Sequence, residues 1–430
     1  MSTRRDFLRT TSGAAAASLL PVEELLADPS PVPQAAPRAP LAAAEPVRIG
    51  LIGTGGMGTS HLEALVKAAK EKRADVAVVA LADICQPRLE AAQSKAEAVQ
   101  GEGSITLYTR YRDLLARKDI HGVLIASPEH WHRQMAEDAL LAGKDVYVEK
   151  PMTLHLKDAL RLKKVADANP QQILNVGTQY VMTPSYRAAR DLIEKGAIGK
   201  PVWSQTSYCR NSKDGEWLYY EIDPKWQPGV NLDWDEWCRP LGKAPWNPEV
   251  YARWRRYRRY STGIIGDLLV HRMTPLIYAM NLGWPTRVTA AGGHYIDTRM
   301  ENHDQVNLTI EFEDGHTMIV AGSTANELGL ETVIRGHRGN LYVGGRNAIL
   351  RPERLFAEEV EEQTIVGEDH GDDQDFLRRK WLECIRTREP APSPVELGTK
   401  VMVIVDLAAR SMWEGKAFGY DWRKQKVKKL

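Results

Sequence analysis

The sequence predicts an α/β protein that begins with a parallel, doubly wound sheet and continues into a second α/β region. Two observations support the first sheet. Short apolar strands and amphipathic helices alternate from Val47 to Val148, and a glycine-rich turn lies at the first strand–helix junction. Such alternation builds parallel βαβ units. Beyond Lys200, strand-like runs separated by turn residues indicate a large, mostly antiparallel sheet.

The composition narrows the class of protein. The chain has 430 residues, which is enough for two to three domains. It carries 57 Lys and Arg against 56 Asp and Glu, and 43% of its residues are apolar. This balance excludes extensive disorder and a charge that would attract nucleic acid. The four cysteines form no Cys-x-x-Cys pair, so we expect no metal site, while one disulfide is left open.

Residues 1–45 are expected to be an export signal followed by a linker. Arg4 and Arg5 precede Phe7-Leu8, a short apolar run follows, and a Pro- and Ala-rich stretch extends to Pro46. This order is typical of a twin-arginine signal and predicts a periplasmic or otherwise exported protein. A basic N-terminus of a cytosolic protein is the alternative. No stretch reaches the roughly 18 apolar residues that span a bilayer, so we expect no membrane span.

The first strand, Val47–Ile52, leads directly into the glycine turn and then into a helix that reaches Lys70. The turn reads Gly53-Thr54-Gly55-Gly56-Met57-Gly58. In a Gly-x-Gly-x-x-Gly turn, the first glycine permits the tight turn, the second lets backbone approach a pyrophosphate, and the third lets the helix pack on the strand. The pattern predicts a dinucleotide-binding Rossmann domain over residues 46–178. A purely structural glycine turn is the alternative.

The second strand, Val76–Ala82, ends at Asp83. A carboxylate at this position accepts a hydrogen bond from the ribose 2′-hydroxyl of NAD. It also repels the 2′-phosphate of NADP, so NAD is the expected cofactor and NADP the less favoured one. Arg88, five residues further on, is placed to stack on adenine or to reach a phosphate.

The remaining elements of the first domain follow in the same order. Strands are expected at Ile105–Tyr108, Val123–Ala126 and Val146–Val148, with helices at Tyr111–Arg117 and His132–Ala142. Ligands bind at the carboxyl edge of such sheets, and the fourth and fifth strands are followed there by Ser127-Pro128 and Glu149-Lys150. A lysine directly after a buried strand is costly unless it faces a polar cleft or a partner.

Residues 179–430 read as a second α/β domain. Strand-like runs occur at Val306–Phe312, His316–Ala321 and Leu341–Val343, and helices are expected at Asp373–Arg388 and Val395–Trp413. The basic tail Arg423–Lys429 is interpreted as solvated charge.

Together, these motifs resemble the Gfo/Idh/MocA oxidoreductase family, named for glucose-fructose oxidoreductase and inositol dehydrogenase. The resemblance extends over nearly the whole chain after Pro46 and includes Glu149-Lys150-Pro151, the run from Gly177 to Gly199, and Asp267-x-x-x-His271. It implies a substrate-binding second domain that also forms a homo-oligomer, a dimer or a tetramer. The implied cofactor contacts are Gly53, Gly55, Gly56, Met57, Gly58, Asp83, Arg88, Ser127, Pro128, His132, Glu149, Lys150 and Gln179.

The resemblance further implies that Lys150, Asp267 and His271 are catalytic. An ammonium group can stabilise a developing alkoxide, and an imidazole can exchange the hydroxyl proton. On a regular helix Asp267 and His271 would share a face, so that the carboxylate orients the imidazole or binds a neighbouring substrate hydroxyl. Which of Lys150 and His271 accepts the proton is left open.

A sugar or polyol substrate is expected because eight of the 12 tryptophans lie between Trp203 and Trp284. Flat aromatic walls suit the apolar faces of sugar rings. Trp217 and Tyr219 are the expected aromatic contacts, beside Lys150, Asp267 and His271. Loop cores or subunit contacts are the alternative role, expected for about half of the tryptophans. The run Arg253–Tyr260 can clamp an acidic sugar or form a salt-bridged or oligomeric surface.

We therefore expect an NAD(P)-dependent oxidoreductase that acts on a secondary hydroxyl of a sugar or polyol. Because free NAD is scarce outside the cytoplasm, an exported enzyme is expected to hold its cofactor tightly and to recycle it. A redox-neutral NAD-dependent glycoside hydrolase working through a transient keto-sugar is the alternative enzyme. A nucleotide-binding sensor without turnover is the alternative outside the enzymes.

Overall fold

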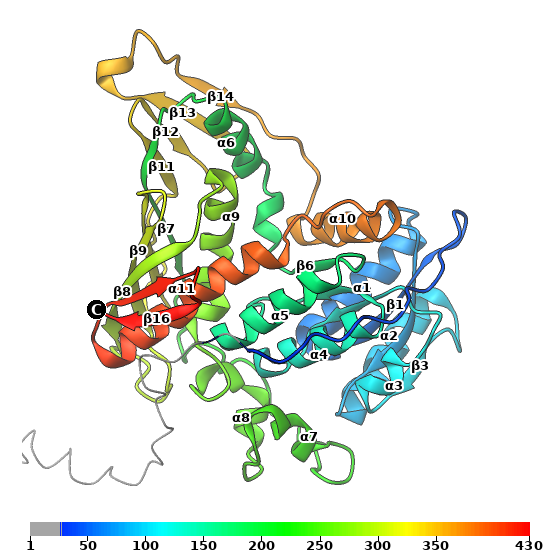
Figure 1. The fold of residues 1–430 in the computed structure, drawn as a ribbon. Helices are drawn as coiled ribbons and strands as arrows, with labels where there is room; N and C mark the ends of the chain where they lie inside the picture. Colours follow the sequence, from blue (N-terminus) through cyan, green and yellow to red (C-terminus); the bar gives the residue numbers. More distant parts are fainter. Residues whose placement is uncertain (1–25, 27) are drawn as a thin grey trace, which may run out of the picture.

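The computed structural model describes residue 26 and residues 28–430, which form two sheets with helices packed between and around them (Figure 1). Arg4, Arg5 and the apolar run of the expected export signal lie outside the described residues. The twin-arginine hypothesis therefore stays a prediction.

The first sheet is parallel throughout and has the strand order β3-β2-β1-β4-β5-β6. Its strands are β1 (Val47–Ile52), β2 (Val76–Ala82), β3 (Thr106–Tyr108), β4 (Gly122–Ile125), β5 (Asp145–Val148) and β6 (Leu174–Val176). Its helices are α1 (Gly56–Lys70), α2 (Gln86–Gln100), α3 (Tyr111–Leu115), α4 (Glu129–Leu141) and α5 (Leu156–Ala168). The strand order reverses between β1 and β4, which is where doubly wound sheets bind their ligands.

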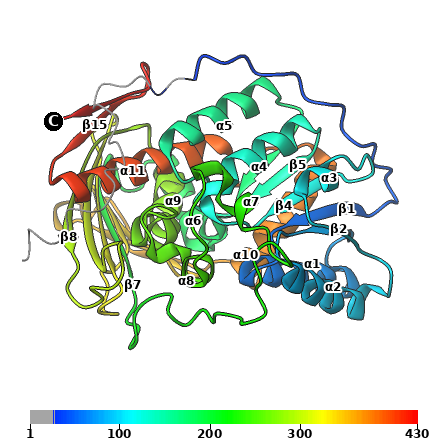
Figure 2. The same ribbon diagram turned by 90° about the horizontal axis from the view of Figure 1, so that it is seen from below.

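One helix of the first layer comes from the other end of the chain. Figure 2 shows α1, α2 and α10 (Asp373–Thr387) on one face of the first sheet and α3, α4 and α5 on the other. Trp381 of α10 packs edge-on against Tyr147 of β5, with 5.6 Å between ring centroids. A side chain at Gly122 of β4 would lie about 3 Å from Trp381 and Ile385. The domain boundary predicted at residue 178 therefore does not separate the chain cleanly, because α10, from the second half of the chain, completes the helix layer on the first sheet.

The second sheet has ten strands in the order β14-β13-β12-β11-β7-β10-β9-β8-β15-β16. Its strands are β7 (Pro201–Cys209), β8 (Pro285–Gly293), β9 (Gln305–Phe312), β10 (Thr317–Ser323), β11 (Val333–Gly336), β12 (Gly339–Tyr342), β13 (Ala348–Pro352), β14 (Gln363–Ile365), β15 (Phe418–Asp421) and β16 (Lys426–Lys429). Only β7 and β10 pair in parallel. The fold class predicted from the sequence is confirmed.

Three helices cover the face of the second sheet that looks toward the first domain (Figure 1). They are α6 (Pro184–Glu194), α9 (Val270–Met280) and α11 (Val395–Glu414). Directly before α6 lies the short 3₁₀ helix η1 (Gln179–Met182), and directly before α9 lies the π-helical turn η4 (Ile265–Leu269). This layer places the start of α9 beside the carboxyl edge of the first sheet.

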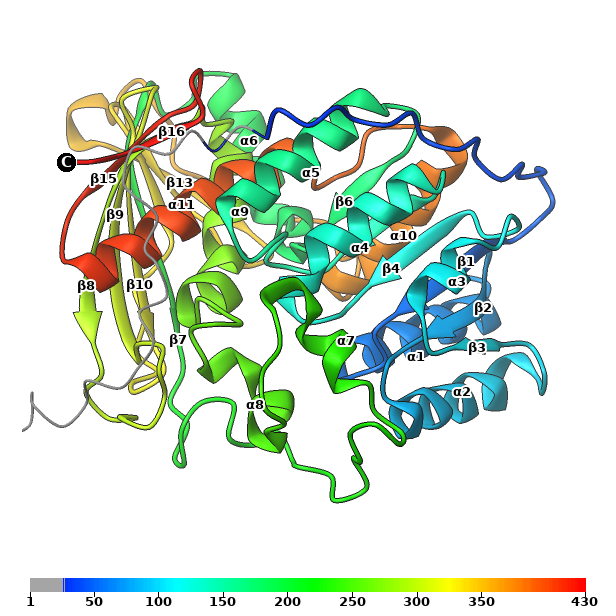
Figure 3. The same cartoon turned by 60° about the horizontal axis from the view of Figure 1, so that its bottom comes forward.

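The segment 210–264, which we call the aromatic cover, leaves the second sheet after β7 and returns at η4. It contains α7 (Trp234–Cys238), α8 (Pro248–Ala252) and the 3₁₀ helices η2 (Arg239–Leu241) and η3 (Trp254–Arg256). Figure 3 shows α7 next to the first domain. The backbone N–H of Asp233 donates to the carbonyl of Ile84, and that of Gln86 donates to the carbonyl of Asn231. The cover is thus fastened to the loop between β2 and α2.

The segment before β1 also packs against the first domain. The N–H of Ala35 donates to Oδ1 of Asn169 at 2.8 Å, and the N–H of Ala36 donates to the carbonyl of Leu141 at 2.8 Å. Arg38 pairs with the buried carboxylate of Asp145. The part of the expected linker that the structure describes is therefore bound along α4 and α5.

The expected helices and strands lie close to those observed, with two informative differences. Helix α4 begins at Glu129, three residues before the expected start at His132, because Pro128 in an extended conformation precedes the first turn. The basic tail is only partly solvated charge: residues 426–429 form the edge strand β16, in which Val427 is buried and Lys428 is exposed. The interpretation of the tail as solvated charge alone was wrong, because its alternating pattern pairs with β15.

All four cysteines are free, so the disulfide left open by the sequence is not formed. Within residues 28–430, no helix combines the length and the apolar character that crossing a membrane requires.

Candidate active site

A cavity of about 820 Å³ lies at the carboxyl edge of the first sheet, between the first domain and the aromatic cover. Its size falls within the range of small-molecule and cofactor sites. The wall is formed by the glycine turn, by the loops that follow β2, β4 and β5, and by residues of the cover.

The three motif glycines have the structural roles that the pattern predicts. Gly53 has a φ of 90°, which favours glycine, and a side chain there would lie 2.8 Å from the backbone of Ala126. A side chain at Gly58 would overlap the carbonyl oxygen of Gly53, so the third glycine lets α1 approach β1. A side chain at Gly55 would meet only Arg88, at 3.7 Å, so this glycine keeps the loop surface open to the cavity.

The N-terminus of α1 is suited to an anion. Gly55 caps the helix without a side-chain hydrogen bond, and no acidic residue lies in the first turn. The first N–H groups of the helix therefore face the cavity with a partial positive charge. Open loop surface, free N–H groups and the adjoining cavity fit the pyrophosphate of NAD. Gly56 and Met57 line the same wall.

Asp83 lies at the end of β2 and lines the cavity, as the sequence predicts. Its Oδ2 accepts hydrogen bonds from the backbone N–H of Thr54 at 2.6 Å and from the Thr54 hydroxyl at 3.0 Å. Its Oδ1 accepts from the N–H of Cys85 at 2.9 Å. The carboxylate is thus held beside the glycine turn, where it fits the ribose of a bound dinucleotide.

Arg88 joins the first domain to the aromatic cover. Its guanidinium lies 4.7 Å from the ring centroids of both Trp226 and Tyr251, and its Nη1 donates to the Tyr251 hydroxyl at 3.1 Å. Arg88 also lines the cavity. Its expected contact with adenine or phosphate stays a prediction.

His132 connects the two strand-end loops that carry the other expected cofactor residues. Its Nδ1 lies 2.8 Å from the carbonyl oxygen of Pro151, and its Nε2 lies 2.7 Å from that of Ser127. Burial lowers the pKa of the ring. Ser127 and Pro128 after β4, and Glu149 and Lys150 after β5, all line the cavity with His132.

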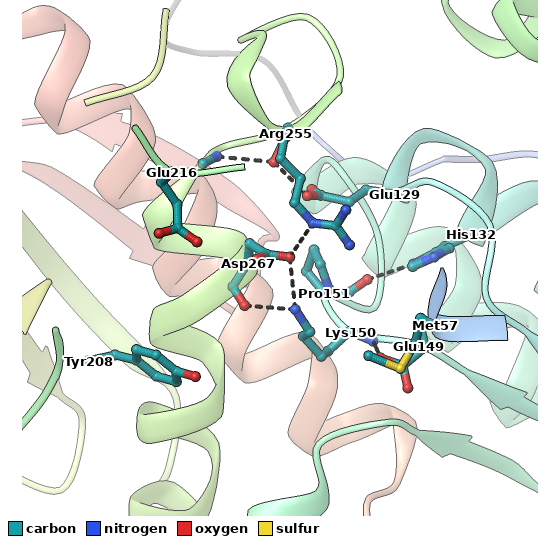
Figure 4. A network of polar contacts seen from close by, with 12 residues as sticks. Met57, Glu129, His132, Glu149, Lys150, Pro151, Tyr208, Glu216, Arg255 and Asp267 are labelled. Atoms are coloured by element: carbon teal, nitrogen blue, oxygen red, sulfur yellow. Dashed lines mark hydrogen bonds and ion pairs between the residues drawn. The ribbon is translucent and has the colours of Figure 1, made fainter. Parts of the chain in front are cut away.

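The central polar contact of the site is an ion pair between the two domains. Nζ of Lys150 donates to Oδ1 of Asp267 at 2.8 Å and to the Asp267 carbonyl at 2.7 Å (Figure 4). Nε of Arg255 donates to the same Oδ1, also at 2.8 Å. Burial opposes ionisation of Asp267, but the charges of Lys150 and Arg255 outweigh it and hold its pKa well below the usual range. Asp267 is therefore an anion shared by two cations.

The expected pairing of Asp267 with His271 is not observed. Asp267 lies in the π-helical turn η4, and no hydrogen bond joins its carboxylate to His271 in the described part of the chain. The Asp267 carboxylate instead bonds to Lys150 and Arg255.

His271 does not line the cavity but lies next to the ion pair, at the start of α9. Its ring packs edge-on against Tyr180, with centroids 5.5 Å apart, and also contacts Tyr208. Its Nδ1 is buried and has no hydrogen-bond partner among the described residues. Burial, followed by the charge of Lys150, lowers the pKa of His271 to about 3. The imidazole is therefore uncharged near pH 7.

Glu129 is a buried acid that the sequence analysis did not identify. It is 2% exposed; its Oε1 accepts from the Ser261 hydroxyl at 2.6 Å, and its Oε2 has no partner among the described residues. Burial raises the pKa of Glu129 to about 8. Figure 4 shows Glu129 beside Arg255. Only the strand-end position of Glu129 could have drawn attention to it.

Besides Gly58, Asp267 and His271, three further expected site residues do not line the cavity: Gln179, Trp217 and Tyr219. Trp217 is 1% exposed and belongs to the main hydrophobic core, so its expected role as a substrate contact is not supported: burial of its large apolar ring stabilises the fold instead. The Tyr219 hydroxyl donates to Oε1 of Glu216 at 3.0 Å. Gln179 begins η1, and its amide oxygen is buried without a partner among the described residues. The neighbouring Tyr220 lines the cavity instead.

Most of the tryptophans in the aromatic cover form a second hydrophobic core. Trp234 stacks on Trp237, with centroids 4.7 Å apart, and Trp226 packs edge-on against Tyr251. Cys85 from the first domain belongs to the same cluster. Of the eight tryptophans between residues 203 and 284, only Trp237 and Trp254 line the cavity. The tryptophans thus mainly hold the cover on the nucleotide-binding edge.

Comparison with known proteins agrees with this geometry. Residues 47–178 match the model described as "Oxidoreductase family, NAD-binding Rossmann fold", and residues 242–419 match that of its "C-terminal alpha/beta domain". The chain is 31% identical over 156 residues to inositol 2-dehydrogenase 1 of Saccharopolyspora erythraea, covering 36% of this chain and 44% of that protein. It is 29% identical over 170 residues to inositol 2-dehydrogenase of Burkholderia multivorans, covering 40% of this chain and 48% of that protein. The match thus spans less than half the length of these relatives.

Solved structures share the fold over most of the chain. A levoglucosan dehydrogenase in complex with NADH and levoglucosan has a TM-score of 0.66 and 20% identity, covering 87% of this chain and 99% of that one. The myo-inositol dehydrogenase from Lactobacillus casei, in complex with NAD(H) and myo-inositol, has a TM-score of 0.63 and 20% identity, covering 87% and 97%. From the glycine turn, the cavity and the two matching domains, we conclude that the chain belongs to the Gfo/Idh/MocA oxidoreductase family and begins with an NAD-binding Rossmann domain.

Proposed function

We propose that the protein is an NAD-dependent oxidoreductase that acts on a secondary hydroxyl of a sugar or polyol. The observation that supports this most strongly is the Lys150–Asp267 ion pair, because it lies at the cavity wall beside the residues that fit a dinucleotide. The names of the relatives, inositol 2-dehydrogenase and levoglucosan dehydrogenase, point to the same substrate class.

In this proposal, bound NAD supplies the hydride acceptor. The Lys150 ammonium, oriented by Asp267, donates a hydrogen bond to the reacting hydroxyl oxygen and stabilises the negative charge that develops as the proton leaves. We assign that proton to His271, which lies next to the ion pair and whose Nδ1 has no partner among the described residues; burial and the Lys150 charge weaken this ring as a base, so the transfer requires the developing alkoxide to offset that charge. Lys150, by contrast, is engaged as a donor to Asp267. The proposal thus takes His271 as the proton acceptor and Lys150 as the hydrogen-bond donor.

The cofactor is proposed to stay bound and to be recycled within each catalytic cycle. The aromatic cover supports this, because it is fastened to the β2–α2 loop and forms one wall of the nucleotide site. Export of the folded protein through the twin-arginine route would load the cofactor in the cytoplasm. A second substrate with a carbonyl group would then reoxidise it.

The proposal is tested with the purified full chain and no added nucleotide. Mass spectrometry of the denatured protein identifies the retained nucleotide. A panel of neutral and acidic sugars and polyols is then added while absorbance at 340 nm is followed. We expect a rise equal to one reduced cofactor per subunit, which a keto-sugar then reverses. Retained NAD that no member of the panel can reduce would contradict the proposal and favour a sensor.

Lys150→Ala is expected to retain the nucleotide and to slow its reduction by roughly 10²- to 10⁴-fold, the usual contribution of such a group. Lys157→Ala, on the exposed side of α5, is the matched control and should match the unaltered protein. Equal rates in the two variants would remove Lys150 from the mechanism. Release of the aglycone from aryl glycosides, with no net change at 340 nm, would instead identify the glycoside hydrolase alternative.

A further inference from the structure

The arginine-rich run at residues 253–259 contains one arginine that differs from the rest. Four of its five arginines are used within the fold. Arg253 donates to the carbonyls of Leu218 and Tyr220, and Arg259 donates to those of Leu241 and Gly242. Arg256 donates to the Asp297 carboxylate and to the Glu216 carbonyl. Arg258 lies over the Trp413 ring. Of the five arginines in this run, only Arg255 lines the cavity.

The guanidinium of Arg255 is fixed on its Nε side, whereas its two terminal nitrogens make no hydrogen bond in the described part of the chain. Its Nε donates to Oδ1 of Asp267 at 2.8 Å, and its guanidinium lies 4.2 Å from the centroid of the Trp254 ring. Neither Nη1 nor Nη2 donates a hydrogen bond to an acceptor within residues 28–430, and neither is among the buried polar atoms that lack a partner. The two terminal nitrogens therefore present a fixed pair of donors to the cavity.

Arg255 has no carboxylate to itself. Lys150 and Arg255 share the single carboxylate of Asp267. Glu129 does not supply a second negative charge at neutral pH, because burial raises its pKa to about 8. Glu149 accepts hydrogen bonds from His61 and from the N–H of Lys150. The charge of Lys150 also acts on Glu149, but Glu149 makes no hydrogen bond to Arg255 within residues 28–430.

We propose that Arg255 binds a carboxylate of the substrate, and that the substrate is therefore an acidic sugar, a uronic or aldonic acid. A guanidinium fork matches a planar carboxylate with two parallel hydrogen bonds. A carboxylate carries one negative charge, which gives the single Arg255 guanidinium a partner of its own, whereas a phosphate ester carries nearly two. This inference rests on the proposed function, and it adds the substrate class.

The test compares sugars that differ only in the acidic group. Glucose and glucuronate form one pair, and galactose and galacturonate form the other. The kcat/KM for reduction of the retained cofactor is expected to be about 10- to 150-fold higher for the acid, as a charge-assisted hydrogen bond contributes roughly 1.5 to 3 kcal/mol. Arg255→Gln should abolish this preference, mainly by raising KM for the acid, and Arg255→Lys should keep part of it. Arg259→Gln, from the same run, is the matched control and should keep all of it.

Two outcomes would overturn the inference. One is an unaltered protein that oxidises the neutral sugar as well as the acid. The other is an Arg255→Gln variant that slows both members of a pair equally, because Arg255 would then only hold Asp267. Nucleotide content and thermal unfolding of each variant show whether it is folded.

Calorimetric titration of the NAD-loaded protein with glucuronate and galacturonate separates this inference from the proposed function. If these acids bind in an Arg255-dependent manner but no sugar reduces the cofactor, the proposed oxidoreductase activity fails and the carboxylate site stands. If neutral sugars are oxidised and the acids are neither bound nor oxidised, the carboxylate site fails and the proposed activity stands.

Discussion

The imidazole of His61 on α1 donates through Nε2 to Oε1 of Glu149, at 2.8 Å, and both side chains are buried. The direction of this bond follows from the other side of the ring. There Nη1 of Arg378 on α10 lies 3.0 Å from Nδ1, and because a guanidinium only donates, Nδ1 is the acceptor. Oε2 of Glu149 accepts from the N–H of Lys150 at 3.1 Å. A chain of hydrogen bonds thus runs from α10 to the backbone of the candidate catalytic lysine.

Replacement of His61 by leucine is expected to lower the free energy of unfolding by about 3 kcal/mol, because it removes the hydrogen-bond partner of Nη1 of Arg378 and of Oε1 of Glu149, both of which are buried. Urea titration measures the effect. Lys67→Ala, at an exposed position of the same helix, should change the stability by less than about 0.5 kcal/mol. If the two variants were equally stable, His61 would not link the three elements.

The glycine turn predicts two different failures. Gly58→Ala would force a side chain into the carbonyl of Gly53, so we expect both the melting temperature and NAD retention to fall. Gly55→Ala has room in the protein, with its nearest neighbour at 3.7 Å, so the fold should persist while NAD retention falls at least tenfold. Thermal unfolding and nucleotide content separate the two. A Gly55→Ala variant that retains NAD normally would show that the pyrophosphate does not approach this glycine.

Asp83→Ala should weaken NAD more than NADP. Loss of the carboxylate removes an acceptor for the ribose and also the repulsion that a 2′-phosphate would meet, so we expect NAD affinity to fall about tenfold and NADP affinity to change less. Titration of nucleotide-free protein with each cofactor measures this. An equal loss for both would mean that Asp83 serves mainly to hold Thr54, to which it is bonded at 2.6 Å.

Glu129 predicts a dependence of stability on pH. Burial raises its pKa from 4.5 to about 8, so the folded state holds a proton that the unfolded state has released across this interval. The contribution of Glu129 to stability is therefore fully present below pH 4.5, declines as the pH rises, and is lost above pH 8. Glu129→Gln should remove this decline, and at pH 8 it should be more stable than the unaltered protein by a few kcal/mol.

Melting temperatures between pH 4.5 and 9 check the Glu129 prediction. Glu63→Gln, half-exposed on α1, is the control and should follow the unaltered protein. Parallel curves for Glu129→Gln and Glu63→Gln would contradict a protonated Glu129.

Five of the six strands of the first sheet could be predicted from the sequence to within about one residue, because each is a short apolar run next to a turn residue, whereas β6 (Leu174–Val176) was not expected. β2 ends at Ala82 as expected, so Asp83 falls at the carboxyl edge of the sheet. Lys150 likewise follows β5, where the topology alone brings it to the cavity. The local sequence pattern therefore predicts both the fold of the first domain and the residues at the ends of its strands.

The pairing of these residues could not be predicted in the same way. Lys150 and Asp267 are 117 residues apart, and no periodicity identifies which of five neighbouring arginines turns inward. Nor does the sequence pattern show that the Asp267 carboxylate bonds to Lys150 and Arg255 rather than to His271. Trp217 shows the same limit, since an aromatic residue in an irregular segment serves a core as readily as a ligand.

The basic strand β16 has a consequence for the solubility of the folded chain. It forms one edge of the ten-stranded sheet, so its outer backbone groups have no neighbouring strand within residues 28–430. Such an edge is a template on which another chain can add a strand and start aggregation, and lysines oppose this by repulsion and by the cost of removing their charges from water. Lys428 and Lys429 are exposed on this edge. The lysines of β16 therefore protect this edge of the sheet against uncontrolled self-association.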